Sequence, residues 1–105
     1  MVIAFDKEYL QELYDKGVAM DKKHRYQPEV VKLYIKRIQI LQKAESVEEL
    51  YQMNSLHYEV LDGDKQGISS IRVNRKYRIE FLVNNTTVEP VVTVCNILEL
   101  SNHYQ

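Results

Sequence analysis

The sequence predicts an α+β fold in which two N-terminal helices pack on one face of a mainly antiparallel sheet of four to five strands. The first observation is a change in hydrophobic period at about residue 56: apolar residues recur at helical spacing before it and alternate as in strands after it. The second is the shortness of the later links, which antiparallel strands allow and parallel strands do not. The third is length: 105 residues suffice for one modest core, so residues 1–105 are expected to form a single domain.

The N-terminal segment is expected to begin with a strand and continue into a helix. The run Val2–Phe5 is short and apolar, which predicts a buried strand. Asp6 is a suitable N-cap for a helix over residues 7–16, and Gly17 is placed to end that helix.

A second helix is expected from Pro28 to about residue 44. Proline is tolerated in the first helical turn because its missing N–H would have no partner there. Val31, Ile35 and Ile38 give this helix an apolar stripe. The sequence Ser46-Val47-Glu48-Glu49 has the spacing of a capping box and predicts a short third helical turn.

The second half is expected to form a meander of four strands, over residues 57–61, 68–73, 77–83 and 87–96. The pair Asn84-Asn85 predicts the hairpin turn before the last strand. Leu98 and Leu100 lie beyond that strand and are expected to fold back as a short turn.

Composition restricts the class of protein. The single cysteine, Cys95, excludes an internal disulfide and favours a reducing, cytoplasmic location. Cys95 and the three histidines have no recognised metal-ligand spacing, so neither a metal nor a cofactor is expected. No apolar run is long enough to span a membrane. The net charge of −1 means that any surface for nucleic acid must be a local patch.

Alternation along the strands predicts one such patch. Ile71 and Ile79 are expected to face the helices. The residues directly before and after each of them in its strand therefore face the other way. This gathers polar side chains on one exposed face of the sheet: His57, Glu59, Arg72 and Arg78. Arginine suits phosphate because its planar group donates two hydrogen bonds and stays charged. A second interpretation is that the arginines pair with Glu59 or Glu80 on neighbouring strands.

One string in this half carries a family resemblance: Leu61-x-Gly63-Asp64-x-x-Gly67-x-x-Ser70-Ile71-Arg72-Val73-Asn74-x-x-Tyr77-Arg78-Ile79-x-Phe81. It resembles the HigB-like killer toxins of type II toxin–antitoxin modules, which belong to the RelE/ParE superfold. The resemblance implies a RelE-like fold and a toxin that cuts messenger RNA at the ribosome. It also implies a partner, a helix-turn-helix (HigA-like) antitoxin encoded beside it, with which the toxin would form a hetero-oligomer.

The resemblance also implies roles for particular residues. Glu59 falls where relatives of the YoeB type carry a general-base glutamate, and Arg78 falls where they hold the scissile phosphate. The histidines His57 and His103 are the further catalytic candidates, the second as the acid. The residues expected to bind RNA are Arg72, Lys65, Arg75 and Tyr104.

The chain departs from the family pattern near its end. HigB and YoeB proteins commonly end their last strand with a Tyr-His pair, whereas residues 94–98 read Val-Cys-Asn-Ile-Leu. The pair His103-Tyr104 comes several residues later, and a folded-back tail would bring it toward Arg78. The alternative function is a catalytically impaired protein of this fold that mainly binds its antitoxin. In either case the helix tyrosines Tyr9, Tyr14 and Tyr34 are expected to form the docking surface for the antitoxin.

Overall fold

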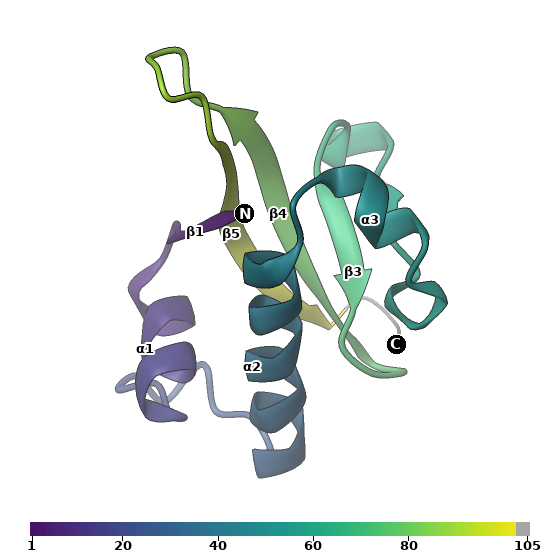
Figure 1. Ribbon diagram of the computed structural model, residues 1–105. Coiled ribbons are helices and arrows are strands. Elements are labelled where there is room, and N and C mark those ends of the chain that lie inside the picture. The colour runs from purple at the N-terminus through teal and green to yellow at the C-terminus, as the bar shows by residue number, and fades with distance from the viewer. Residues whose placement is uncertain (103–105) are drawn as a thin grey trace.

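The chain forms three α-helices, two short 3₁₀ turns and a five-stranded sheet in the computed structural model, which describes residues 1–102 (Figure 1). The elements, in chain order, are β1 (Val2–Phe5), α1 (Glu8–Lys16), α2 (Pro28–Lys43), α3 (Val47–Tyr51), η1 (Asn54–Leu56), β2 (Glu59–Val60), η2 (Gly63–Lys65), β3 (Ser69–Arg72), β4 (Tyr77–Asn85) and β5 (Thr93–Asn102). The α+β class predicted from the sequence is confirmed.

The sheet is mixed, with strand order β1-β5-β4-β3-β2. Strands β2 to β5 form the predicted antiparallel meander. Strand β1 joins beside β5 and runs parallel to it, so the sheet is not antiparallel throughout. The helices and strands β2 to β4 all lie between β1 and β5 in the chain, which more than supplies the long crossover that a parallel pair requires.

The core lies between the apolar side of this sheet and the helices. Helices α1 and α2 lie side by side in front of the sheet (Figure 1). Their apolar stripes are largely buried against it: Leu10, Tyr34 and Ile38 are fully buried, whereas Ile35 is half-buried at the edge of the predicted stripe. Helix α3, with Ser46 as its N-cap, confirms the predicted third helical turn. It contributes a fully buried side chain, Leu50, so the layer of two helices in the predicted fold was incomplete.

The ends of α1 show one confirmed and one wrong prediction. Gly17 ends the helix in the left-handed region, at φ 77°, and its N–H donates to the carbonyl of Leu13. The N-cap is Lys7 and not Asp6. The reason is that Asp6 is still held by the sheet, because its N–H donates to the carbonyl of Ile97 at 2.8 Å.

The position of the last strand was predicted wrongly. Strand β4 continues through Asn84 and Asn85, which pair with Val94 and Thr93, so these asparagines are strand residues and not the turn. The β4–β5 hairpin therefore extends well beyond the helices (Figure 1), and β5 runs from Thr93 to Asn102. Leu98 and Leu100 consequently lie in the strand and do not fold back, with Leu98 as the extra residue at a bulge opposite Glu80 and Phe81.

Both edge strands of the sheet are partly exposed to solvent. Val2 is half exposed because β1 has a neighbour on one side only, so the run Val2–Phe5 is not a buried strand. Strand β2 contains only Glu59 and Val60, and Val60 is likewise half exposed and not in the core. Strands this short leave little unpaired edge.

Candidate active site

The face of the sheet opposite to the helices carries two rows of polar residues. Cross-strand pairing aligns Arg72 with Arg78 and Arg78 with Ser101, on β3, β4 and β5. The neighbouring row contains Glu59, Ser70, Glu80 and Glu99, one from each strand of the meander. Residues paired in this way, within one row, stand about 5 Å apart. The two rows follow each other along the strands on one face, so the cationic groups of one row are neighbours of the acidic groups of the other.

Arg78 lies on the predicted face but is buried, with 2% of its surface exposed. Its Nε donates to the Ser70 hydroxyl, and its Nη2 donates to the carbonyls of His57 and Ser70 at 2.7 and 3.3 Å. A buried guanidinium needs such partners, because an unpartnered buried charge is strongly destabilising. The expectation that Arg78 is exposed is therefore wrong, although its place on the polar face is as predicted.

His57 and Arg72 form the accessible part of the cluster. The Arg72 Nη1 lies 3.3 Å from the His57 Nε2. Arginine can only donate, so the His57 Nε2 is the acceptor of a hydrogen bond at this contact. Arg72 is half-buried, and its Nε donates to the carbonyl of Asn74 at 3.2 Å.

The backbone of His57 departs from the predicted strand 57–61. Its φ of 46° places it in the left-handed region, where it caps η1. This conformation costs a non-glycine residue about 1–3 kcal/mol, so it persists only where the surroundings hold the residue in it. The Arg78 bond to the His57 carbonyl is such a restraint. Two residues of the polar face are thus coupled, one buried and one exposed.

Lys65 and Glu80 form an ion pair beside this cluster. The Lys65 Nζ lies 2.9 and 3.0 Å from the two oxygens of Glu80. The Lys65 side chain is 40% exposed, whereas that of Glu80 is 4% exposed. The interpretation that the arginines pair with Glu80 missed this partner, because nothing in the strand pattern shows that η2 folds over β4.

The remaining predicted residues are open to solvent or beyond the described range. Glu59 is exposed in β2, in register with Ser70. Arg75 is exposed in the β3–β4 link. His103 and Tyr104 lie outside the described residues, but β5 ends at Asn102, so the pair directly follows the last strand in sequence. The gap that separated it from the predicted strand end came from misplacing that strand.

Sequence reasoning did not assign roles to Ser70 and Ser101. Ser70 is fully buried and accepts from Arg78, and Ser101 pairs with Arg78 across β4 and β5. The sequence placed Ser70 on the polar face, between Glu59 and Glu80, and this was the signal that could have indicated its role. Because small hydroxyl residues are common in strands, that position alone did not identify it as a partner of Arg78.

The tyrosine docking surface is contradicted by burial. Tyr9 and Tyr34 are buried in the core, and Tyr14 packs partly against it. Tyr34 donates from its hydroxyl to the carbonyl of Leu10 at 2.7 Å, which ties α2 to α1. These tyrosines hold the helices together, because their rings complete the apolar stripes.

Two further properties concern cofactors and membranes. Across residues 1–102, no group of three or more His, Cys, Asp and Glu side chains is arranged to hold a metal ion. None of the helices in that range has the length and apolar character to cross a membrane. Cys95 is fully buried in β5, and burial raises the pKa of its thiol to about 11.

Comparison with known proteins places this fold and surface in context. The model of the RelE-like toxins of type II toxin–antitoxin system HigB matches residues 3–93. Toxin HigB-1 of Vibrio cholerae is 29% identical over 96 residues, which cover 86% of this chain and 97% of that protein. The solved YoeB/ParE toxin from Agrobacterium tumefaciens shares the fold, with a TM-score of 0.62 at 14% identity over 99% of this chain and 100% of that one. The chain belongs to the family of HigB-like, RelE-fold toxins of type II toxin–antitoxin systems, whose members have an antitoxin as partner.

Proposed function

We propose that the protein is a ribosome-dependent endoribonuclease that cleaves messenger RNA in the cytoplasm by metal-independent acid–base chemistry. The observation that carries this proposal is the cluster of His57, Arg72 and Arg78, with Glu59 one row away, in which His57 and Glu59 are exposed and Arg78 is buried. The exposed groups can meet a polymer held against the ribosome, and the two guanidinium groups concentrate positive charge on a protein with a net charge of −1.

Cleavage requires a base, a stabiliser of charge and an acid. The exposed carboxylate of Glu59 takes the proton of a ribose 2′-OH, whose oxygen then forms a bond to phosphorus. The bond from phosphorus to the 5′-oxygen breaks, and an acid gives that oxygen a proton. The products are a 2′,3′-cyclic phosphate and a 5′-hydroxyl. His57, 3.3 Å from Arg72, is the second candidate for the acid.

The arginines have different tasks in this scheme because their exposure differs. Arg72 is half-buried and its guanidinium reaches the surface beside His57, so it holds the scissile phosphate. Arg78 acts from beneath, by adding positive charge and by fixing the His57 carbonyl. Lys65 and Arg75 contact the flanking RNA, and the pair His103-Tyr104 supplies the acid and a ring for stacking.

The decisive experiment measures cleavage of a message on translating ribosomes, together with growth after induction. Glu59→Gln is expected to slow cleavage by about 10²-fold, because a positioned base contributes 10²–10⁴. Arg72→Ala is expected to slow it by at least about tenfold, through loss of a donor to the developing charge. Lys36→Met, at an exposed position of α2, is the matched control and should cut as the wild type does.

A helix-turn-helix, HigA-like antitoxin encoded beside the gene is proposed as the partner in a hetero-oligomer. Its co-expression in the same growth assay should relieve the arrest. A folded wild-type protein that causes no arrest and cuts no message on ribosomes would contradict the nuclease. Retained antitoxin binding would then support the alternative of a catalytically impaired, antitoxin-binding protein.

A further inference from the structure

Strand β5 loses its neighbour on one side halfway along its length. The parallel pairing with β1 runs from Val94 to Ile97 and ends when Asp6 donates to the Ile97 carbonyl. Beyond that point β5 is paired with β4 alone, as far as Asn102. Unpaired backbone groups on this outer edge would need other partners, because buried N–H and C=O groups are almost always hydrogen-bonded.

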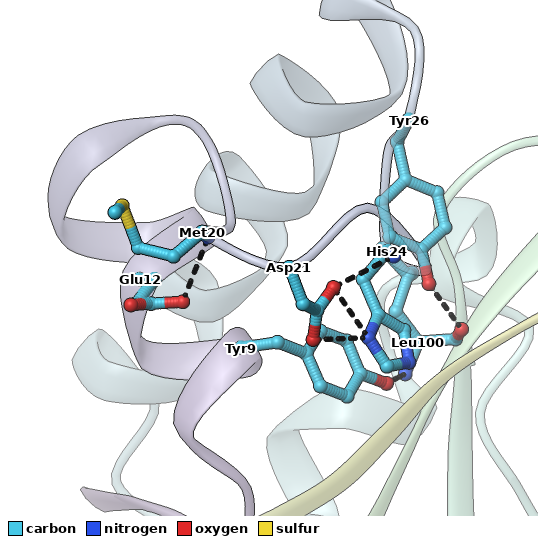
Figure 2. A network of polar contacts seen from close by, with 7 residues as sticks. All are labelled: Tyr9, Glu12, Met20, Asp21, His24, Tyr26 and Leu100. Atoms are coloured by element: carbon cyan, nitrogen blue, oxygen red, sulfur yellow. Dashed lines mark hydrogen bonds and ion pairs between the residues drawn. The ribbon is translucent and has the colours of Figure 1, made fainter.

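Two tyrosine hydroxyls take the place of the missing strand (Figure 2). The Leu100 N–H donates to the Tyr9 hydroxyl at 3.3 Å. The Tyr26 hydroxyl donates to the Leu100 carbonyl at 3.3 Å. Both polar groups of one β5 residue are thus held from the helical side of the molecule, one from α1 and one from the connector between α1 and α2.

Each tyrosine is itself fixed in place. The ring of Tyr9 is stacked on His24, with ring centres 3.5 Å apart and planes 5° from parallel. The His24 imidazole Nδ1 lies 3.0 and 3.1 Å from the two oxygens of Asp21, which also accepts the His24 backbone N–H (Figure 2). Tyr26 packs edge-on against Tyr77 at 5.4 Å. The connector is therefore a built structure and not merely a solvated loop.

The held segment is the end of β5 that borders the candidate active site. Ser101, the next residue, is paired with Arg78, and Asn102 is paired with Tyr77. The sequence then continues into His103 and Tyr104. We propose that Tyr9 and Tyr26 are positioning residues that fix the C-terminal end of β5, and with it the pairing of Ser101 with Arg78. The catalytic part of this inference rests on the proposed nuclease function.

The hydroxyls, and not only the rings, carry this role. Burial is the main cause that raises the pKa of Tyr9 and of Tyr26 above the usual value, so both phenols are neutral at physiological pH. Neutral Tyr26 keeps the proton that it donates to Leu100. Replacement by phenylalanine retains the ring stacking and the packing against Tyr77 while it removes the bonds to Leu100.

The test compares Tyr9→Phe, Tyr26→Phe and the double variant with Tyr14→Phe. Tyr14 is the matched control because it also lies on α1, and its hydroxyl donates to Gln42 at 3.5 Å, away from β5. The first readout is amide hydrogen exchange at Leu100 and Ser101. Exchange is expected to become about tenfold faster or more in the Tyr9 and Tyr26 variants and to stay unchanged in the control.

The second readout is single-turnover cleavage on ribosomes, corrected for the folded fraction. Misplacement of a catalytic group by about 1 Å can cost 10²-fold, so the maximal rate in the double variant is expected to fall about tenfold or more. The ribosome concentration at half-saturation should stay within about twofold, because the binding surface is untouched. A merely structural role would not separate these two quantities once the folded fraction is corrected. Tyr26→Phe, at a half-buried site, serves if the double variant does not fold.

Three outcomes overturn parts of the inference. Unchanged exchange at Leu100 overturns the claim that the two tyrosine hydroxyls hold β5, here called the clamp, whether or not the wild type cuts RNA. Faster exchange with an unchanged maximal rate overturns the positioning role. A wild-type protein that cuts no message overturns the nuclease and the catalytic part together, whereas faster exchange in Tyr9→Phe would still support the clamp.

Discussion

At the scale of single residues, the polar face depends on a few charges that are almost completely covered. Glu80 is 3% exposed and Arg78 is 2% exposed, and each needs a specific partner in place of water. Lys65 meets this need for Glu80 from η2, at 2.9 Å. Removal of one partner from such a pair costs more than the pair contributes, because the other charge is left unpaired.

Lys65→Met is therefore expected to lower the free energy of unfolding by about 1–3 kcal/mol. Urea denaturation at neutral pH measures the loss, and Lys36→Met on the exposed face of α2 is the control, expected to change stability by less than about 0.5 kcal/mol. The double variant Lys65→Met with Glu80→Leu should recover part of the loss, since it also removes the orphaned carboxylate. Equal stability of Lys65→Met and the control would show that Glu80 does not depend on Lys65.

At the scale of elements, the connection between α1 and α2 can be tested at one bond. The Tyr34 hydroxyl, fully buried, donates to the Leu10 carbonyl at 2.7 Å. Tyr34→Phe keeps the ring in the core but loses this bond, so a loss of about 1 kcal/mol is expected in urea denaturation. Tyr14→Phe, with its longer contact to Gln42, should cost less. The reverse order would mean that the bond does not tie the helices.

The elements also show where sequence patterns succeed and fail. Alternation placed Ile71 and Ile79 in the core and Arg72 and Arg78 on the opposite face, because period two is a local property of an extended chain. The end of β4 was missed because Asn84 and Asn85 are typical turn residues, yet cross-strand pairing in a long hairpin holds them in strand conformation. The misplaced turn then displaced the whole of β5.

The candidate site shows the same division. Its members on β3 and β4 followed from alternation, whereas the burial of Arg78 depends on His57 and Ser70 from two other segments. The parallel contact of β1 with β5 joins residues 2–5 to residues 94–97, and no local pattern encodes such a distant pairing. Tyr9 and Tyr26 were likewise invisible as partners of Leu100, since a tyrosine at a core position predicts packing and not its hydrogen bond.

At the scale of the whole molecule, burial of phenols links stability to alkaline pH. Burial is the main cause that raises the pKa of four tyrosines above the usual value: Tyr9, Tyr26, Tyr34 and Tyr58. In the unfolded chain these groups ionise near pH 10, as free tyrosine does. A group whose pKa is raised by folding favours the folded state fully below the unfolded pKa, and that contribution is lost as pH rises toward the folded pKa. Stability should therefore fall above about pH 10.

The prediction is a free energy of unfolding that is nearly constant from pH 7 to 8.5 and then declines. The buried Cys95 thiol, with its pKa raised to about 11, begins the decline near pH 9. Each raised phenol then adds a slope of up to about 1.4 kcal/mol per pH unit. Urea denaturation at pH 8, 9.5 and 10.5 measures the slope. Tyr34→Phe should make it shallower because one buried phenol is removed. A slope that Tyr34→Phe does not alter would mean that this phenol ionises as readily in the folded protein as in the unfolded chain, contrary to its complete burial.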